Sequence, residues 1–140
     1  MKKYIFSVIA VLALGLFYGC DQSDQASTDE IKIGVILGFT GPIESLTPTM
    51  ASSAELAMKE VSDSGLLLGG AKVSSVRADS TCVDAGAATS AAERLVTSDN
   101  VAAIMGADCS GVTTAIANNV AVPNGVTIIS PSATSPALTD

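Results

Sequence analysis

The sequence predicts an α/β domain built on a doubly wound, mostly parallel sheet. Short runs of β-branched and apolar residues alternate with longer segments that carry apolar residues at helical spacing. The resulting order is strand, helix, strand, helix, strand, helix, strand, which is typical of βαβ units joined by right-handed crossovers.

The predicted folded region covers residues 31–140 and begins with a strand at IKIGVILG, residues 31–38. Its nearly continuous apolar character is typical of a strand buried on both faces of a parallel sheet. A helix is expected over about residues 47–64, where Glu55 and Lys59 can pair one turn apart on the exposed side. The helix is expected to bury the apolar side chains that recur every three or four residues, namely Met50, Ala54, Ala57 and Val61.

Residues 72–79 predict a second strand, and Asp84 is expected to cap the helix that follows. This Ala-rich helix extends to about Thr97. Its buried positions are expected to be Ala88, Ala92 and Leu95.

The apolar segment of residues 101–106 predicts a third strand, and Ser110 is expected to cap a third helix with Val112 and Ala115 facing inward. Residues 126–130 predict the fourth strand. Ligands of doubly wound sheets bind at the carboxyl ends of the strands. The loops that could bind a ligand are therefore residues 39–46, 80–84, 107–111 and 131–134.

The first twenty residues predict an export signal rather than part of the fold. Two lysines precede a 13-residue apolar run, Ile5 to Phe17, and Gly19 stands directly before Cys20. This order is typical of a secretory signal peptide, residues 1–19, and the run is shorter than the ~20 residues that a membrane-spanning helix requires. The segment resembles the lipobox of bacterial lipoproteins, which implies that Cys20 is acylated and becomes the N-terminus.

Residues 20–30 have little apolar character and predict a flexible, lipid-anchored tether. If Cys20 carries lipid, Cys82 and Cys109 remain as a pair in an exported, oxidised protein. Removing the signal leaves five basic and fourteen acidic residues, a net charge of −9. Such an acidic surface repels phosphate backbones, so nucleic acid is excluded as a partner.

The loop at residues 107–111, Ala-Asp-Cys-Ser-Gly, is the first candidate binding site. A helix N-terminus attracts anions such as carboxylates, Ser110 adds a hydroxyl, and Gly111 lets a ligand approach the backbone. Two alternatives stand beside this interpretation. Ser110 can simply cap its own helix, or Cys109 can be the nucleophile of a cysteine hydrolase. The hydrolase requires a histidine base beyond residue 140, because the sequence contains no histidine.

The second candidate is residues 130–136, a Ser/Pro-rich segment whose hydroxyls, carbonyls and N–H groups can bind an ammonium or a carboxylate. By itself it can also be an ordinary turn. The first strand is not followed by the glycine pattern of a dinucleotide site, and the sequence lacks a metal-ligand cluster. We therefore expect neither a cofactor nor a metal.

The order of short motifs along the chain resembles the substrate-binding proteins of branched-chain amino-acid ABC transporters, which have the periplasmic-binding-protein type I fold. The resemblance runs from about residue 31 to residue 140. The motifs that carry it are Phe39-Thr40-Gly41-Pro42, Glu55-Leu56-Ala57, Gly69-Gly70, Asp79 with Cys82, Gly106 with Cys109-Ser110, and Ser130 to Thr139.

The resemblance implies two lobes that close on a ligand, and it implies roles for particular residues. Ser110 and Thr134 would hold the α-carboxylate and α-ammonium of an amino acid, with help from the backbone at Ser132. Leu46 would line the side-chain pocket. Cysteines at the positions of Cys82 and Cys109 are joined in the leucine-type members.

The sequence also departs from this family, whose members run to well over 300 residues, so the chain is expected to be an incomplete N-terminal lobe. Asp108 is an unusual acid in the binding loop and is included among the candidate ligand residues. The resulting prediction is an extracytoplasmic, lipid-anchored binding protein, not an enzyme, that delivers an amino acid or similar small polar ligand to the permease of an ABC importer. The alternative is the ligand-sensing ectodomain of a receptor with the same fold.

Overall fold

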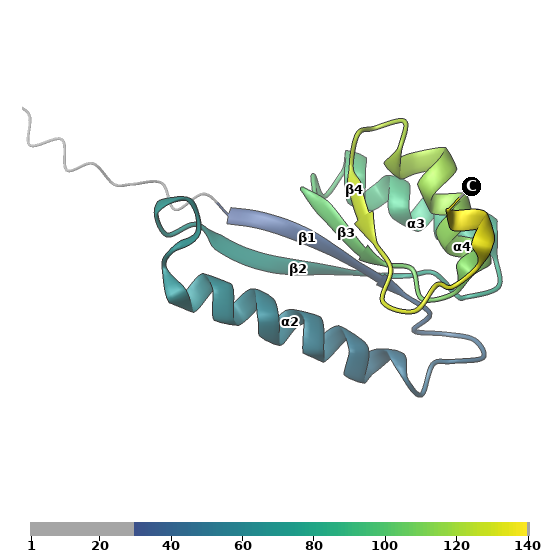
Figure 1. Ribbon diagram of the computed structural model, residues 1–140, viewed down its shortest axis with the longest axis horizontal. Coiled ribbons are helices and arrows are strands. Elements are labelled where there is room, and N and C mark those ends of the chain that lie inside the picture. The colour runs from purple at the N-terminus through teal and green to yellow at the C-terminus, as the bar shows by residue number, and fades with distance from the viewer. Residues whose placement is uncertain (1–29, 140) are drawn as a thin grey trace, which may run out of the picture.

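The computed structural model describes residues 30–139 and contains one sheet of four parallel strands in the order β2-β1-β3-β4 (Figure 1). The strands are β1 (Glu30–Leu37), β2 (Lys72–Asp79), β3 (Ala103–Gly106) and β4 (Thr127–Ile129). The predicted parallel α/β architecture is confirmed. The export signal and Cys20 lie outside the described residues.

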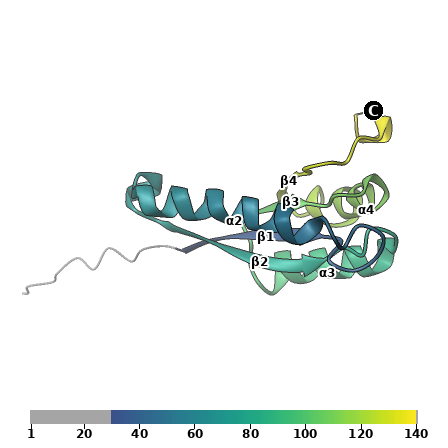
Figure 2. The ribbon, with the colours of Figure 1, turned by 90° about the horizontal axis from the view of Figure 1, so that it is seen from below.

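Helices cover both faces of the sheet (Figure 2). Helix α2 (Thr47–Ser64) lies on one face, and α3 (Ala85–Thr97) and α4 (Ser110–Ile116) lie on the other. Helix α4 continues into a π-helical turn, Ala117–Ala121, and so ends before Pro123. Short 3-10 turns occur at Leu67–Gly69 and Pro136–Leu138. Within residues 30–139, no helix combines the length and apolar character needed to cross a membrane.

The larger core lies between the sheet and the pair α3 and α4. Side chains of the sheet, such as Ile36 and Ile104, pack there against the helices. Ala88, Ala92 and Leu95 are fully buried in this core, as their spacing predicts. Asp84 accepts a hydrogen bond from the backbone N–H of Ala87 at 2.9 Å, so the predicted cap of α3 is also confirmed.

The buried face of α2 differs from the prediction. Its buried residues are Thr47, Ala51 and Ser62, whereas Ala57 and Val61 are exposed. Two of the buried residues are hydroxyl-bearing, and each bonds the backbone beside the sheet: Thr47 Oγ1 donates to Gly38 O at 3.0 Å, and Ser62 Oγ accepts from Val73 N at 2.7 Å. Of the predicted stripe, Met50 packs against the core and Ala54 is half-buried, so the prediction holds only for the first half of the helix.

The predicted pair between Glu55 and Lys59 is wrong. Glu55 instead binds the guanidinium of Arg77 on β2 with both carboxylate oxygens, each at 2.7 Å. The hydrogen bonds from Arg77 lower the pKa of Glu55 below its usual range, although burial acts in the opposite direction. Lys59 pairs with Asp63, one turn further along α2.

Candidate ligand-binding site

The carboxyl ends of the four strands place the loops singled out by the sequence along one edge of the sheet. The strand order makes β1 and β3 neighbours. The helices that follow these two strands leave toward opposite faces of the sheet, which creates a topological switch point at this edge. In a doubly wound sheet, such a point is where ligands bind.

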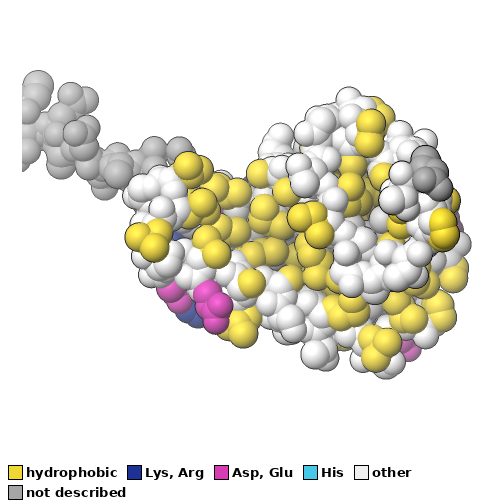
Figure 3. Space-filling model, viewed as in Figure 1, with side chains coloured by type: hydrophobic (Ala, Val, Ile, Leu, Met, Phe, Trp, Pro, Cys, Tyr) yellow, Lys and Arg dark blue, Asp and Glu magenta, His cyan; other side chains and the backbone are white. Residues whose placement is uncertain are grey.

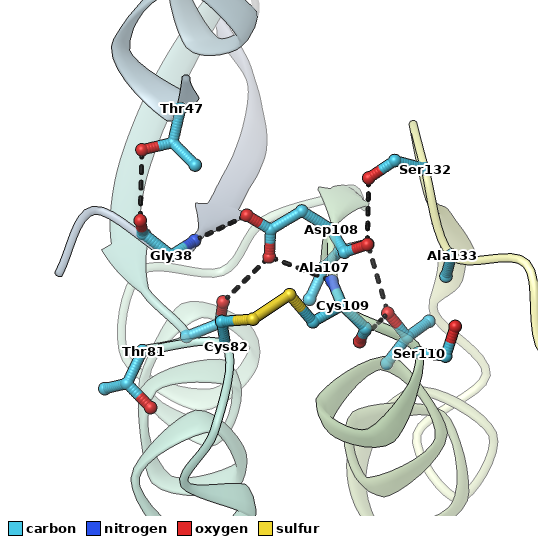
Figure 4. Close-up of a disulfide and its surroundings, with 12 residues drawn as sticks. Gly38, Thr47, Thr81, Cys82, Ala107, Asp108, Cys109, Ser110, Ser132 and Ala133 are labelled. Carbon is cyan, nitrogen blue, oxygen red and sulfur yellow. Dashed lines mark hydrogen bonds between the residues drawn. A yellow bond between two sulfur atoms is a disulfide. The ribbon is translucent and has the colours of Figure 1, made fainter. Parts of the chain in front are cut away.

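A disulfide joins the loop after β2 to the loop after β3. Cys82 and Cys109 have their Cα atoms 5.2 Å apart, and their bond crosses the end of β1, the strand that lies between β2 and β3 (Figure 4). Because the sulfur of Cys109 is committed to this bond, it is not available as a thiolate nucleophile. The hydrolase alternative therefore loses its reactive group.

The backbone before the disulfide is strained. Thr81 and Cys82 both have positive φ, 57° and 69°, in the left-handed region that side chains other than glycine rarely adopt. Local hydrogen bonds hold the turn, because Thr81 N donates to Asp79 Oδ1 at 2.8 Å and Asp84 N donates to Thr81 Oγ1 at 3.0 Å. The loop after β2 is thus fixed at both ends.

Asp108 connects three loops from within the protein. Asp108 is only 4% exposed, and one of its carboxylate oxygens accepts from Gly38 N at 2.9 Å. The other oxygen accepts from Ser80 Oγ at 3.3 Å and Cys109 N at 3.0 Å. Figure 4 shows this carboxylate pointing toward Gly38, away from Ser132. The structure therefore gives the Asp108 side chain internal partners, and its role in ligand binding stays a prediction.

A second carboxylate, which was not among the predicted ligand-binding residues, fixes the loop after β1. Asp79 at the end of β2 accepts from Thr40 Oγ1 at 2.6 Å and from Thr40 N at 3.3 Å. Burial raises the pKa of Asp79. The hydrogen bonds from Thr40 and from Thr81 N outweigh that effect and leave the pKa below its usual value. The guanidinium of Arg77 lies 5.5 Å from the centre of the Phe39 ring and supports the same loop.

One interpretation of the sequence expected Ser110 to cap its own helix. The structure contradicts it. The N-cap residue is Cys109, and no side-chain hydrogen bond caps α4. Ser110 is the first helical residue, and its Oγ accepts from Thr134 N at 3.0 Å and Ser135 N at 3.2 Å. Two lone pairs are the acceptor capacity of a hydroxyl. The Ser110 hydroxyl therefore keeps its proton to donate.

The loop after β4 docks on the loop after β3. Ser132 Oγ donates to Asp108 O at 2.8 Å, and Ser130 Oγ donates to Ala107 O. These bonds bring Ser132 and Thr134 beside Ser110, although 22 or more residues separate them in sequence. Thr134 is exposed at this edge. The two segments predicted as separate candidate sites, residues 107–111 and 130–136, thus form one surface.

The start of α4 adds backbone donors to this surface. The first intrahelical bond runs from Thr113 N to Cys109 O at 3.0 Å, so the preceding N–H groups of the helix lack an intrahelical acceptor. Gly111 is one of them. A Cβ placed on Gly111 would meet no atom within 4 Å, which leaves its backbone open to a ligand.

Leu46 lies in a different part of the edge. It directly precedes α2 in the loop after β1, and its side chain is 60% exposed. The structure therefore brings together Ser110, Ser132 and Thr134 on the α4 side and places Leu46 on the α2 side. Among residues 30–139, His, Cys, Asp and Glu side chains form no group of three that could hold a metal ion.

A model of the periplasmic binding protein family matches residues 30–140. The chain belongs to the periplasmic binding protein family. The leucine-specific-binding protein of Salmonella typhimurium is 29% identical over 99% of the chain and 35% of its own length. The Leu/Ile/Val-binding protein homolog 1 of Brucella abortus is 32% identical over 100% of the chain and 35% of its own length. The chain thus spans about a third of the length of these curated relatives.

Solved structures of periplasmic binding proteins show the same fold. The branched-chain amino acid transporter substrate-binding protein LivJ of Streptococcus pneumoniae, in complex with isoleucine, is 33% identical with a TM-score of 0.71 over 79% of this chain and 31% of its own. A substrate-binding protein of Desulfitobacterium hafniense, in complex with Leu, is 30% identical with a TM-score of 0.68 over 80% of this chain and 31% of its own. These similar proteins are solute-binding proteins rather than enzymes, and the described sheet corresponds to part of one lobe of the type I fold.

Proposed function

We propose that this chain contributes the amino-terminal lobe of an exported lipoprotein that binds an amino acid, or a similar small polar ligand, for an ABC importer. The family supports a binding protein, and the names of its relatives point to branched-chain amino acids. The signal-like segment that ends at Cys20 supports export and acylation. Delivery of the bound ligand to the permease of that importer is part of the same proposal.

The state of the Ser110 hydroxyl is the observation that carries the proposal. Its oxygen already accepts from the N–H groups of Thr134 and Ser135, so the hydroxyl can interact with a ligand only as a donor. A donor beside the open N–H of Gly111 suits an anion. We therefore assign the α-carboxylate of the ligand to Ser110 and the start of α4.

Thr134 and the loop that contains it supply the complementary groups. The Thr134 hydroxyl is exposed next to Ser110, and it can accept a hydrogen bond from an ammonium group. The α-ammonium is therefore assigned to Thr134, with the backbone around Ser132 beside it. Leu46, from the opposite side of the edge, would contact the side chain of the ligand. Asp108 would act by holding the loops in place rather than by touching the ligand.

Titration calorimetry on the full-length protein with leucine, isoleucine and valine tests this function. Heat of binding with saturable stoichiometry is expected for at least one of them. An absence of binding across a panel of amino acids, in a protein that is shown to be folded, would contradict it.

A further inference from the structure

The turn between α2 and β2 exposes leucine side chains at one end of the molecule. Leu66 is 87% exposed and Leu68 is 80% exposed, the highest values for large hydrophobic residues in the part of the chain that is described. Single exposed leucines are common on soluble proteins. These two lie on a segment, residues 64–71, that carries no charged residue although the sequence has a net charge of −7.

The turn holds these side chains outward. Leu67 O accepts from both Gly70 N and Ala71 N at 2.8 Å, and Leu66 N donates to Ser64 Oγ at 3.2 Å. Leu68 has a φ of 42°, in the left-handed region that leucine rarely adopts. These hydrogen bonds fix the backbone of the turn on which the two exposed leucines lie.

This turn lies where the chain enters the sheet. Glu30, the first residue of β1, pairs with Lys72, the first residue of β2, and Lys72 follows the turn after a single residue, Ala71. Figure 1 shows the turn beside the start of β1, and in Figure 3 hydrophobic side chains lie at this end as well as across the rest of the visible face. The ligand-binding edge, formed by the carboxyl ends of the strands, lies at the opposite end of the strands.

The distance along the chain ties this end to the predicted anchor. Cys20 precedes Glu30 by ten residues. A chain of ten residues spans at most ~35 Å. A short tether of this kind raises the effective concentration of the turn at the anchoring surface to about the millimolar range.

We propose that Leu66 and Leu68 form a lipid contact that docks the amino end of the lobe on the membrane. Their side chains would enter the boundary between headgroups and acyl chains and would turn the ligand-binding edge away from the surface. Asp63 and Lys72 flank the turn with opposite charges, so the contact is apolar rather than a response to anionic lipid. The proposal rests on the anchoring of Cys20 that is part of the proposed function.

A tryptophan probe tests the contact without depending on acylation. The full-length mature protein, with an N-terminal hexahistidine in place of Cys20, is attached through nickel-chelating lipid to vesicles of phosphatidylethanolamine and phosphatidylglycerol. Residues 1–140 contain no tryptophan, so Leu66→Trp adds a probe in the turn. Leu56→Trp is the matched control, because Leu56 is 57% exposed on α2, outside the turn.

Brominated acyl chains quench only a tryptophan that reaches them. The emission added by Leu66→Trp is expected to fall in brominated relative to unbrominated vesicles, whereas the emission added by Leu56→Trp stays the same. Adding Leu68→Ser to Leu66→Trp should reduce the quenching. Equal quenching of the two probes, or none for Leu66→Trp, would overturn the lipid contact, and neither result would affect solute binding, which calorimetry measures separately.

Discussion

The carboxylate of Asp108 accepts a hydrogen bond from the backbone N–H of Gly38 at 2.9 Å, across 70 residues of sequence. The bond joins the end of β1 to the loop after β3, at the switch point of the sheet. The same buried side chain also binds Ser80 and Cys109. One acid thus sets the relative positions of the loops that form the candidate site.

Replacing this acid by its amide should destabilise the lobe. Asp108→Asn keeps the volume of the side chain, but its NH2 group replaces one of two oxygens that both accept hydrogen bonds, so it faces another donor. A buried polar group left unpaired costs about 1–3 kcal/mol. We expect a loss of about 2 kcal/mol in the free energy of unfolding, measured by urea denaturation of the full-length protein. Asp63→Asn is the control, since Asp63 is exposed and its ion pair with Lys59 should matter little. Equal effects of the two variants would show that the hydrogen bonds of Asp108 are dispensable.

The disulfide between Cys82 and Cys109 should form in the exported protein. It closes a separation of 27 residues, and in the chain-entropy model such a loop stabilises the fold by about 3.5 kcal/mol. Cys82→Ser with Cys109→Ser should lower the free energy of unfolding toward that amount. Mass spectrometry of peptides from non-reduced protein checks the bond itself, and two free thiols in oxidised material would be the opposite result.

The depressed pKa of Asp79 predicts a loss of stability in acid. A carboxyl whose pKa is lower in the folded state stabilises the fold above its unfolded pKa, near 3.8, and this stabilisation is lost as the pH falls from there through the lower folded value. Comparing the pH dependence of unfolding for wild type and Asp79→Asn tests this. The variant should show a flatter dependence below about pH 4. Parallel curves for the two proteins would mean that Thr40 does not stabilise the charged form.

Local patterns in the sequence predicted the strands, the ends of α2 and the cap of α3, because apolar β-branched runs, helical spacing and an aspartate before an Ala-rich segment act within a few residues. Long-range partners could not be predicted in this way. Glu55 binds Arg77, 22 residues away in sequence, instead of the nearby Lys59. Ser110 accepts a hydrogen bond from Thr134, 24 residues away. Thr47 and Ser62 bond the backbone around the sheet, which a count of apolar residues does not register. Such contacts depend on which elements the fold brings together.

The anchoring prediction concerns Cys20, which lies outside the described residues. Cys20→Ser removes the thiol that would be acylated, so the variant should be either retained with its leader or released unprocessed. Stable anchoring takes two acyl chains, because one binds a membrane only marginally. Membrane fractionation with intact mass measurement reports both properties. A Cys20→Ser protein that is processed and still fractionates with membranes would rule out the lipoprotein assignment.

Selectivity among ligands should depend on Leu46 and not on the groups that hold the α-carboxylate and α-ammonium. Leu46→Tyr changes only the surface assigned to the ligand side chain. Its affinities should therefore shift unequally among leucine, isoleucine, valine and phenylalanine in titration calorimetry. Uniform changes across the four ligands would place Leu46 outside the pocket.

The most direct measurement is the affinity of Ser110→Ala for the same ligands, in the full-length protein. A charge-assisted hydrogen bond is worth about 1.5–3 kcal/mol, or roughly a tenfold to hundredfold change in affinity. Every amino acid has the same α-groups, so Ser110→Ala and Thr134→Ala should weaken all ligands by similar factors, and Ser110→Thr, which keeps a hydroxyl, should weaken them less. If Ser110→Ala binds every ligand as tightly as wild type, Ser110 only fastens the loop of Thr134, and the assigned ligand site is wrong.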